Sequence, residues 1–193
     1  MSLEKLFRFS EVIGKLKNVK RSGWISHVGI ENPESVADHS FRSAVLAMCI
    51  GGLLDVDTEK LLKMLLLHDV QEALTGDYDV FAKKKIGMNE FKAQEKSAAL
   101  KVLSVLPSEL RKEYIDIWEE FEKQKTPEAI LANDIDKIEM MIQALEYEKQ
   151  GYDSEKFNAF WTSVQKKIKT TIMKDLLKLL SEKRNRVSNS HLA

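Results

Sequence analysis

Apolar residues recur at helical spacing along most of the chain. In residues 3–17, and again in 89–106 and 110–121, they return every three or four positions, which places them on one side of an amphipathic helix. The strongest stripe runs from Phe157 to Leu176. We interpret it as part of one helix over about 154–180 that either completes the core or faces a second subunit.

Capping patterns mark the starts of further helices. Ser35, followed by Asp38 three residues later, resembles a capping box and predicts a helix that ends near Gly51. Thr126 followed by Pro127 has the residue types of an N-cap and first helical position. Together with a start at residue 57 or 58, these patterns predict helices over residues 35–50, 58–74 and 127–150.

The composition agrees with this helical pattern. The 193 residues include only eight glycines and three prolines, and 44% of them are hydrophobic, which is enough for one well-packed core. We therefore predict an all-α fold. We expect one domain over residues 1–186 and a disordered polar tail over 187–193.

Charge and cysteine content narrow the function classes. Thirty basic residues balance thirty acidic ones, so no global field would attract a nucleic acid polymer or an acidic membrane. The single Cys49 cannot form an intramolecular disulfide, and its apolar neighbours indicate a small buried side chain. Because no leader or membrane span is apparent, we expect a cytoplasmic protein.

The most unusual pattern is His68-Asp69 followed by Glu72, directly after the apolar run 61–67. On a straight helix Glu72 would fall between the other two, so one imidazole and two carboxylates would share a face. Buried carboxylates are paired, protonated or bound to a metal. We interpret the pattern as a metal site. A solvated helix end is the alternative, so the rest of the chain must supply the missing ligands.

Other predicted helices offer those ligands. His39 shares a helical face with apolar and small residues, so its side chain is expected to point toward the core. Asp134 and Asp136 lie about 200° apart around the long helix, and both cannot serve one site in the same way. The pattern does not choose between them. Nearer the end of this helix, Glu146 and Glu148 are interpreted as surface charges.

Two basic segments are open to two interpretations. Arg21 and Trp24 flank Gly23 in a predicted loop, where they would suit an anion joined to a flat ring. The alternative is an exposed arginine beside a tryptophan that packs on the core. The lysines at 83–85 are expected on a solvated surface, with a phosphate-facing edge as the alternative.

Taken in order, His39, His68-Asp69 and a late aspartate give an H…HD…D pattern that resembles the HD-domain metal-dependent phosphohydrolases. The resemblance covers most of the chain. It is narrower for the 5′-deoxynucleotidase branch, whose motifs resemble residues 21–24, 34–39, 68–77 and 136–148. It implies an all-helical HD-type bundle, usually a homodimer. Such enzymes hydrolyse nucleoside 5′-monophosphates to nucleoside and phosphate with a divalent ion such as Co²⁺ or Mn²⁺.

The resemblance also implies roles for individual residues. Four match the metal ligands of the family: His39, His68, Asp69 and Asp136. This match favours Asp136 over Asp134.

Glu72 matches the catalytic position, where we expect it to take a proton from the nucleophilic water. The substrate-contacting positions are matched by Arg21, Trp24 and Asp77. In some eukaryotic members, Glu72 and Asp77 correspond to residues of a second, magnesium-type site. Ser22 stands where the family commonly has threonine, but it keeps the hydroxyl.

Three functions follow as hypotheses. The first is hydrolysis of nucleoside 5′-monophosphates, with deoxy substrates favoured. The second is an HD phosphohydrolase that acts on a triphosphate, an alarmone or a cyclic nucleotide; a triphosphate would require more basic residues than Arg21 provides. The third is a helical metal-binding module without turnover. The presence of Glu72 argues against the third, because such a module has no need of an acid there.

Overall fold

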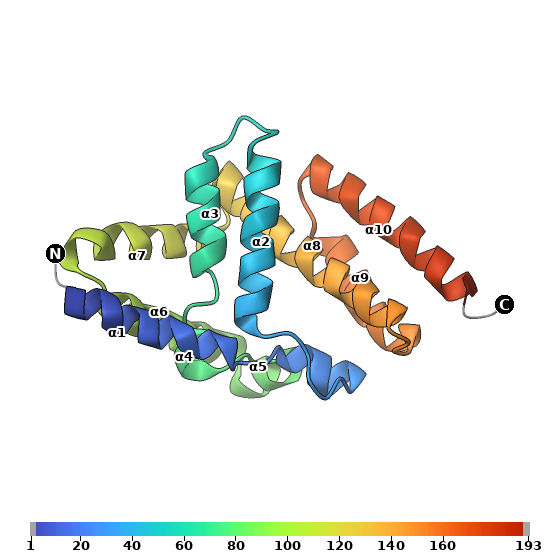
Figure 1. The fold of residues 1–193 in the computed structure, drawn as a ribbon, viewed down its shortest axis with the longest axis horizontal. Coiled ribbons are helices and arrows are strands. Elements are labelled where there is room, and N and C mark those ends of the chain that lie inside the picture. Colours follow the sequence, from blue (N-terminus) through green and yellow to red (C-terminus); the bar gives the residue numbers. More distant parts are fainter. Residues whose placement is uncertain (1–2, 191–193) are drawn as a thin grey trace.

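The computed structural model describes residues 3–190, with side chains to residue 186, as helices joined by turns (Figure 1). The all-α prediction is confirmed. Within the described residues, the helices are α1 (Leu3–Gly14), α2 (Val36–Gly51), α3 (Thr58–Leu67), α4 (Glu72–Thr75), α5 (Val80–Ile86), α6 (Met88–Ser104), α7 (Ser108–Lys123), α8 (Pro127–Lys149), α9 (Asn158–Lys167) and α10 (Thr171–Ser190). Short helical turns are η1 (Lys15–Lys17), η2 (Trp24–Val28) and η3 (Ser154–Phe157).

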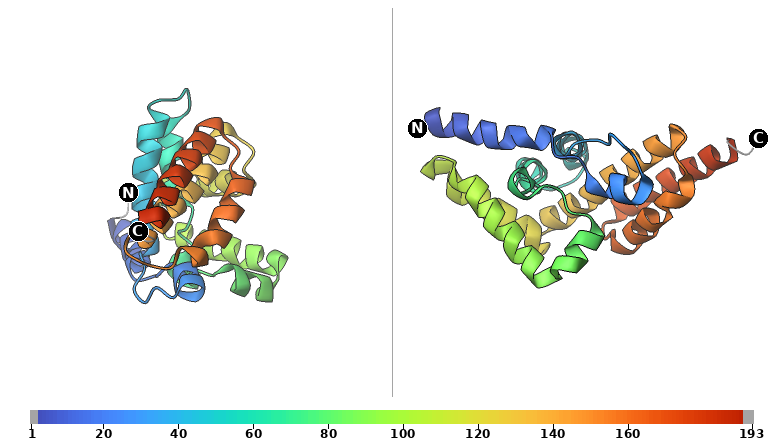
Figure 2. Two further views of the ribbon diagram at one scale, coloured as in Figure 1. Left: turned by 90° about the vertical axis from the view of Figure 1, so that its right-hand side faces the viewer. Right: turned by 90° about the horizontal axis from the view of Figure 1, so that it is seen from below.

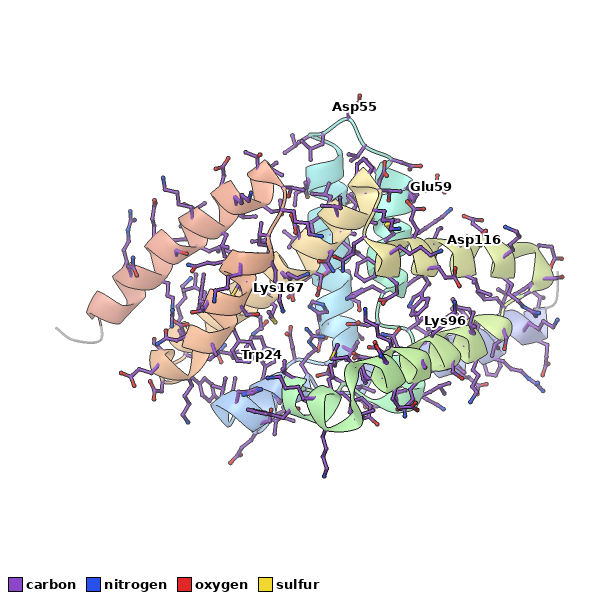
Figure 3. All side chains as sticks on the ribbon, turned by 180° about the vertical axis from the view of Figure 1, so that it is seen from behind. Trp24, Asp55, Glu59, Lys96, Asp116 and Lys167 are labelled. Carbon is purple, nitrogen blue, oxygen red and sulfur yellow. The ribbon has the colours of Figure 1, made fainter. Side chains whose placement is uncertain are left out.

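Helix α8 is the element around which the others pack. It contacts α2, α3, α7, α9 and α10, and Figure 1 shows it crossing behind the α2–α3 pair. Its core residues include Ile135, Ile138 and Met141, which are fully buried. Viewed from below, α1 lies along one side of the molecule and α6 and α7 along the other (Figure 2). Charged side chains such as Asp55, Glu59 and Asp116 point outward (Figure 3).

The predicted helix starts are confirmed by their caps. Ser35 and Asp38 form the full capping box, in which each side chain accepts from the other residue's backbone N–H. The side chain of Thr126 accepts a hydrogen bond from the N–H of Ala129. An N-cap of this kind is worth about 1 kcal/mol. These local bonds fix where α2 and α8 enter the core.

The predicted helix over 58–74 is wrong in its second half. α3 ends at Leu67, and a turn separates it from the short α4. In this turn the N–H of Val70 donates to the carbonyl of Leu67, and that of Glu72 to the carbonyl of Asp69. The tighter three-residue bonds turn the chain away from the α3 axis. His68 and Asp69 therefore project from a turn.

The predicted continuous helix over 154–180 is also wrong. α9 ends at Lys167 and α10 begins at Thr171, because Asp134 accepts hydrogen bonds from the backbone between them. Its Oδ2 accepts from the N–H groups of Lys169 and Thr170 at 2.9 and 2.7 Å. α10 then continues to Ser190. Of the tail predicted at 187–193, residues 187–190 are helical and 191–193 lie outside the described residues.

Two burial predictions are wrong. Cys49 is exposed on the outer face of α2, next to Met48, rather than buried. Glu148 is fully buried rather than on the surface, because Arg184 donates to both of its carboxylate oxygens.

None of the described helices has the length and apolar character that crossing a membrane would require.

The segment between η1 and α2 is closed at its base. Lys20 pairs with Ser35 in an isolated β-bridge, and the N–H of Arg21 donates to the carbonyl of Glu34 at 3.2 Å. Between these ends lies η2, which stops at Gly29 in the left-handed conformation at φ 85°. The segment predicted as a loop therefore contains a helical turn whose ends are held together.

Candidate metal centre and adjoining cavity

The four predicted metal ligands come together from three parts of the fold. His39 lies on α2, Asp136 on α8, and His68 and Asp69 in the turn after α3. His39 Nε2 is 3.1 Å from Asp136 Oδ1, and His68 Nε2 is 3.1 Å from Asp69 Oδ2. The two Nε2 atoms are 3.3 Å apart. His39, His68 and Asp136 thus converge on one space, and Asp69 joins it beside His68.

The outer nitrogens of both imidazoles face acceptors. His68 Nδ1 lies 2.8 Å from the carbonyl oxygen of Leu65, and His39 Nδ1 faces the carboxylate of Glu139. Because these partners only accept, each Nδ1 carries a hydrogen. In the neutral rings, each Nε2 then offers a lone pair toward the centre.

This donor set fits a divalent ion. Two imidazole lone pairs and two carboxylates face one another, an arrangement that a proton or a cation must compensate. Burial lowers the pKa of His39, but hydrogen bonds with Asp136 and Glu139 raise it overall to about 9. Atoms of His39, His68 and Asp136 all lie within 4.8 Å of one another. Mixed nitrogen and oxygen ligands of this kind suit first-row metals.

Glu139 is supported by a second layer of side chains. Arg42 Nε donates to Glu139 Oε1 at 2.7 Å, and its Nη atoms donate to Gln143 and Glu146. Arg42 thereby neutralises the carboxylate that orients His39. Glu139 has no role predicted from the sequence, although it lies within the motif at 136–148 and one helical turn after Asp136.

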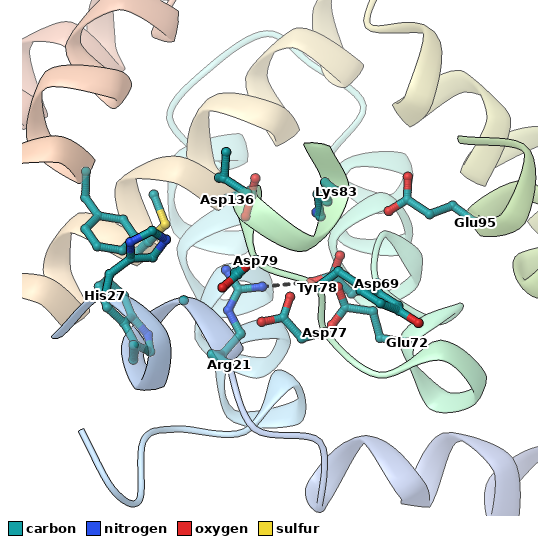
Figure 4. A pocket seen from close by; sticks show the side chains of 15 residues that line it. Arg21, His27, Asp69, Glu72, Asp77, Tyr78, Asp79, Lys83, Glu95 and Asp136 are labelled. Carbon is teal, nitrogen blue, oxygen red and sulfur yellow. Dashed lines mark hydrogen bonds and ion pairs between the residues drawn. The ribbon is translucent and has the colours of Figure 1, made fainter. Parts of the chain in front are cut away.

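A cavity of about 230 Å³ opens beside this cluster. Figure 4 shows Arg21 near its middle, His27 on one side and Glu95 on the other. Six carboxylates line the cavity, against the cations Arg21 and Lys83. The remaining lining residues are Gly23, Trp24, His27, Tyr78, Val80, Met140 and Phe160. With this charge balance, an anion would enter only where a cation compensates the carboxylates.

Glu72 is a buried carboxyl at the edge of the cavity. It is 5% exposed, and its Oε2 has no hydrogen-bond partner among the described residues. Burial, followed by the nearby charges of Asp69 and Asp77, raises the pKa of Glu72 well above its usual range. A carboxyl in this environment keeps its proton to a higher pH than a solvated one, and it can also receive a cation.

Arg21 presents its guanidinium to the same space. Its Nη1 lies 3.4 Å from Asp69 Oδ2, and its side chain is 15% exposed. Burial lowers the pKa of Arg21, but the charges of Asp77 and Asp69 raise it above its ordinary value. Arg21 therefore carries a permanent positive charge between carboxylates.

Asp77 and Trp24 also line the cavity, and both have structural partners. Asp77 Oδ2 accepts hydrogen bonds from the backbone N–H and the hydroxyl of Ser22, which joins the Arg21 segment to the turn after α4. Trp24 is only 2% exposed and donates from Nε1 to Glu34 Oε1 at 3.0 Å. The tryptophan thus packs in the core while one part of it faces the cavity.

The two candidate aspartates on α8 are separated by the structure. Asp136 joins the histidines, whereas Asp134 lies on another side of the helix and caps the chain before α10. Several cavity residues have no role predicted from the sequence, namely His27, Tyr78, Asp79, Glu95, Met140 and Phe160. They come from η2, α8, α9 and the 78–95 region. Helical spacing in the sequence therefore gives no signal that they lie together.

Curated relatives align over nearly the whole chain. A 5′-deoxynucleotidase from Dictyostelium discoideum is 38% identical and is matched over 94% of this chain and 100% of its own length. The human 5′-deoxynucleotidase HDDC2 is 33% identical, with 92% of this chain and 83% of that protein covered.

Solved structures show the same fold. A conserved hypothetical protein from Pyrococcus furiosus superposes with a TM-score of 0.73 at 32% identity, covering 93% of this chain and 99% of that one. The sequence profile of the HD domain matches residues 13–179, which lie inside the domain predicted at 1–186. The chain therefore belongs to the HD domain family.

Proposed function

We propose that the protein hydrolyses nucleoside 5′-monophosphates, preferentially the deoxy forms, to nucleoside and phosphate in a metal-dependent reaction. The observation that carries this proposal is the convergence of His39, His68, Asp69 and Asp136 beside a cavity that also contains Arg21 and Glu72. The relatives named 5′-deoxynucleotidase, aligned end to end, support the choice of substrate.

The metal would be held by His39, His68, Asp69 and Asp136, with Co²⁺ or Mn²⁺ as the preferred ion. When bound, such an ion lowers the pKa of a coordinated water and polarises a phosphoryl oxygen. A second, magnesium-type ion would use Glu72 and Asp77. The unpartnered Oε2 of Glu72 supports this second site.

The protein groups then have distinct tasks. Arg21 would hold the phosphate through paired N–H bonds, which its fixed charge and planar fork suit. Glu72 would take the proton of the attacking water, a role supported by its raised pKa and its place next to the ligand turn. Asp77 would accept from a sugar hydroxyl or an ion-bound water, and Trp24 would limit the space for the sugar.

A triphosphate is the less suitable substrate. The cavity lining holds only two cationic side chains, Arg21 and Lys83, to face the added phosphates.

We also propose a cytoplasmic homodimer. The exposed apolar side chains of Phe41 and Met48, which share the outer face of α2 at 70% and 53% exposure, support a subunit contact. Sedimentation equilibrium tests this assembly: a monomer at micromolar protein concentration would contradict it.

The deciding experiment measures phosphate release from ribo- and deoxynucleoside mono-, di- and triphosphates, with Co²⁺, Mn²⁺ and Mg²⁺ in turn. We expect the deoxynucleoside monophosphates to give the highest kcat/KM, and Co²⁺ or Mn²⁺ to support the fastest turnover. Absence of monophosphate cleavage with every ion would overturn the proposal.

A further inference from the structure

The cavity has one side that the proposed chemistry does not use. Asp69, Glu72 and Asp136 gather near the candidate metal centre, whereas His27, Phe160 and Met140 form a mainly apolar wall on the other side of Arg21. Figure 4 shows His27 among these side chains, away from Asp69 and Glu72. The wall comes from η2, α9 and α8, which are separate in sequence.

The imidazole of His27 is held between two aromatic rings. Its centroid is 4.9 Å from that of Phe81 at an interplanar angle of 30°, and 5.5 Å from that of Phe160 at 89°. Phe160 in turn packs on buried Trp24 at 4.9 Å. The wall is thus anchored in the core through Phe160.

His27 lies near the charge of Asp79 but is not hydrogen-bonded to any described residue. Within the described residues, neither ring nitrogen makes a hydrogen bond, although the side chain is half-buried and lines the cavity. The imidazole therefore offers a hydrogen-bonding edge to a ligand, set in a cluster of aromatic rings. An aliphatic side chain would offer no such edge.

The charge beside His27 excludes a phosphate from this wall. Asp79 lines the same part of the cavity, and hydrogen bonds from the Ala82 N–H and the Ser26 hydroxyl lower the pKa of its carboxyl. An ionised carboxylate at this place repels an anion but tolerates a neutral ring with polar edges. The phosphate is therefore directed toward Arg21 and the candidate metal centre.

We propose that His27 and Phe160 form the nucleobase-binding wall of the substrate site, and that they make the protein prefer intact nucleotides to sugar phosphates without a base. This inference rests on the proposed function and adds a specificity-determining pair to it. Any base can stack on an aromatic ring because every base has a π face. The ring nitrogens of His27 can in addition discriminate among the hydrogen-bonding edges of the bases.

The test pairs a variant with a shortened substrate. kcat/KM is measured for a deoxynucleoside 5′-monophosphate and for 2-deoxyribose 5-phosphate, with wild type, His27→Ala and Phe160→Ala. We expect each variant to lose about tenfold on the nucleotide, mainly through KM, and to change little on the base-free substrate. His27→Phe should keep most of the affinity and alter the ranking of the bases, because it retains an aromatic ring and loses the nitrogens.

Ile25→Ala is the matched control, since Ile25 lies on the same turn, is 45% exposed and does not line the cavity. It should leave both substrates unchanged, and thermal unfolding should show that each variant is folded. The base-binding wall would be contradicted if His27→Ala lost equally on both substrates, or if the wild type had equal kcat/KM for both. Neither result would contradict the proposed nucleotidase activity. If the wild type cleaves no nucleotide, the proposed function fails first.

Discussion

Two carboxylates on α8, Asp136 and Glu148, illustrate opposite ways of placing a negative charge inside a protein. Glu148 is fully buried and surrounded by donors: Arg184 Nε lies 2.9 and 2.8 Å from its two oxygens, and Trp161 Nε1 is 3.1 Å from Oε1. Asp136 faces the Nε2 atoms of His39 and His68, whose lone pairs point inward when the rings are neutral. The first arrangement is complete without a ligand, whereas the second needs either a proton or a cation to compensate its carboxylates.

The largest expected effect comes from removing the carboxylate of Asp136. Asp136→Ala should lose bound metal and phosphate release together, because one of the converging ligands disappears. Metal content is measured by mass spectrometry of the purified protein and activity by phosphate release.

Asp134→Ala is its matched control two residues away. It should retain metal but unfold more easily by about 1–3 kcal/mol, because the N–H groups of Lys169 and Thr170 lose their acceptor. Normal metal content in Asp136→Ala, or metal loss in Asp134→Ala, would reverse the assignment of the two aspartates.

Substitution of Glu72 should separate metal binding from turnover. Glu72→Gln keeps the size of the side chain and removes its capacity to take a proton, so kcat should fall by about 10²- to 10⁴-fold while bound Co²⁺ or Mn²⁺ is unchanged. Steady-state kinetics and metal analysis on the same preparation provide the check. A variant with nearly wild-type kcat would remove Glu72 from proton transfer.

Glu148→Ala should affect stability alone. Removing one partner of a buried ion pair costs about 3–5 kcal/mol, because Arg184 loses its carboxylate in the interior. Urea unfolding gives the free energy, and the folded variant should bind metal and release phosphate like the wild type. If metal binding fell instead, the two clusters would be energetically linked through α8.

Metal removal should change stability by an amount that depends on the metal concentration. At a free metal concentration about 100 times its Kd, binding adds about 2.7 kcal/mol to the folded state. Chelation should therefore lower the Tm of the wild type and leave that of Asp136→Ala unmoved. An equal Tm shift in both proteins would mean that the stabilising ion binds elsewhere.

The parts of the fold that depend on neighbouring residues were predictable from the sequence. The capping box at Ser35 and the cap at Thr126 are complete within a few residues, and the structure shows both. The break before α10 was not predictable, because it depends on Asp134, more than thirty residues away. The apolar stripe from Phe157 to Leu176 continues across that break and conceals it.

The candidate metal centre was more predictable than the cavity. His39, His68, Asp69 and Asp136 follow an ordered motif, and the structure brings atoms of His39, His68 and Asp136 within 4.8 Å of one another, with Asp69 beside His68; their role as metal ligands stays a prediction. The orienting role of Glu139 and the burial of Glu148 depend on Arg42 and Arg184, whose contacts cannot be read from helical spacing. His27 was missed for a related reason: its environment is made by Phe81 and Phe160, which come from other parts of the chain.

The closed base of the segment before α2 allows the residues of this segment to change during evolution while the position of α2 stays the same. Because the Lys20–Ser35 bridge and the Arg21–Glu34 hydrogen bond hold the ends of this segment, its positions outside the core can vary in sequence without shifting the helix that carries His39, unlike the buried Trp24, Val28 and Ile30. The side chains that differ in such variants would include position 27. Under the proposed function, chains with the same candidate metal ligands would thus diverge in the nucleotides they select through substitutions in one short segment.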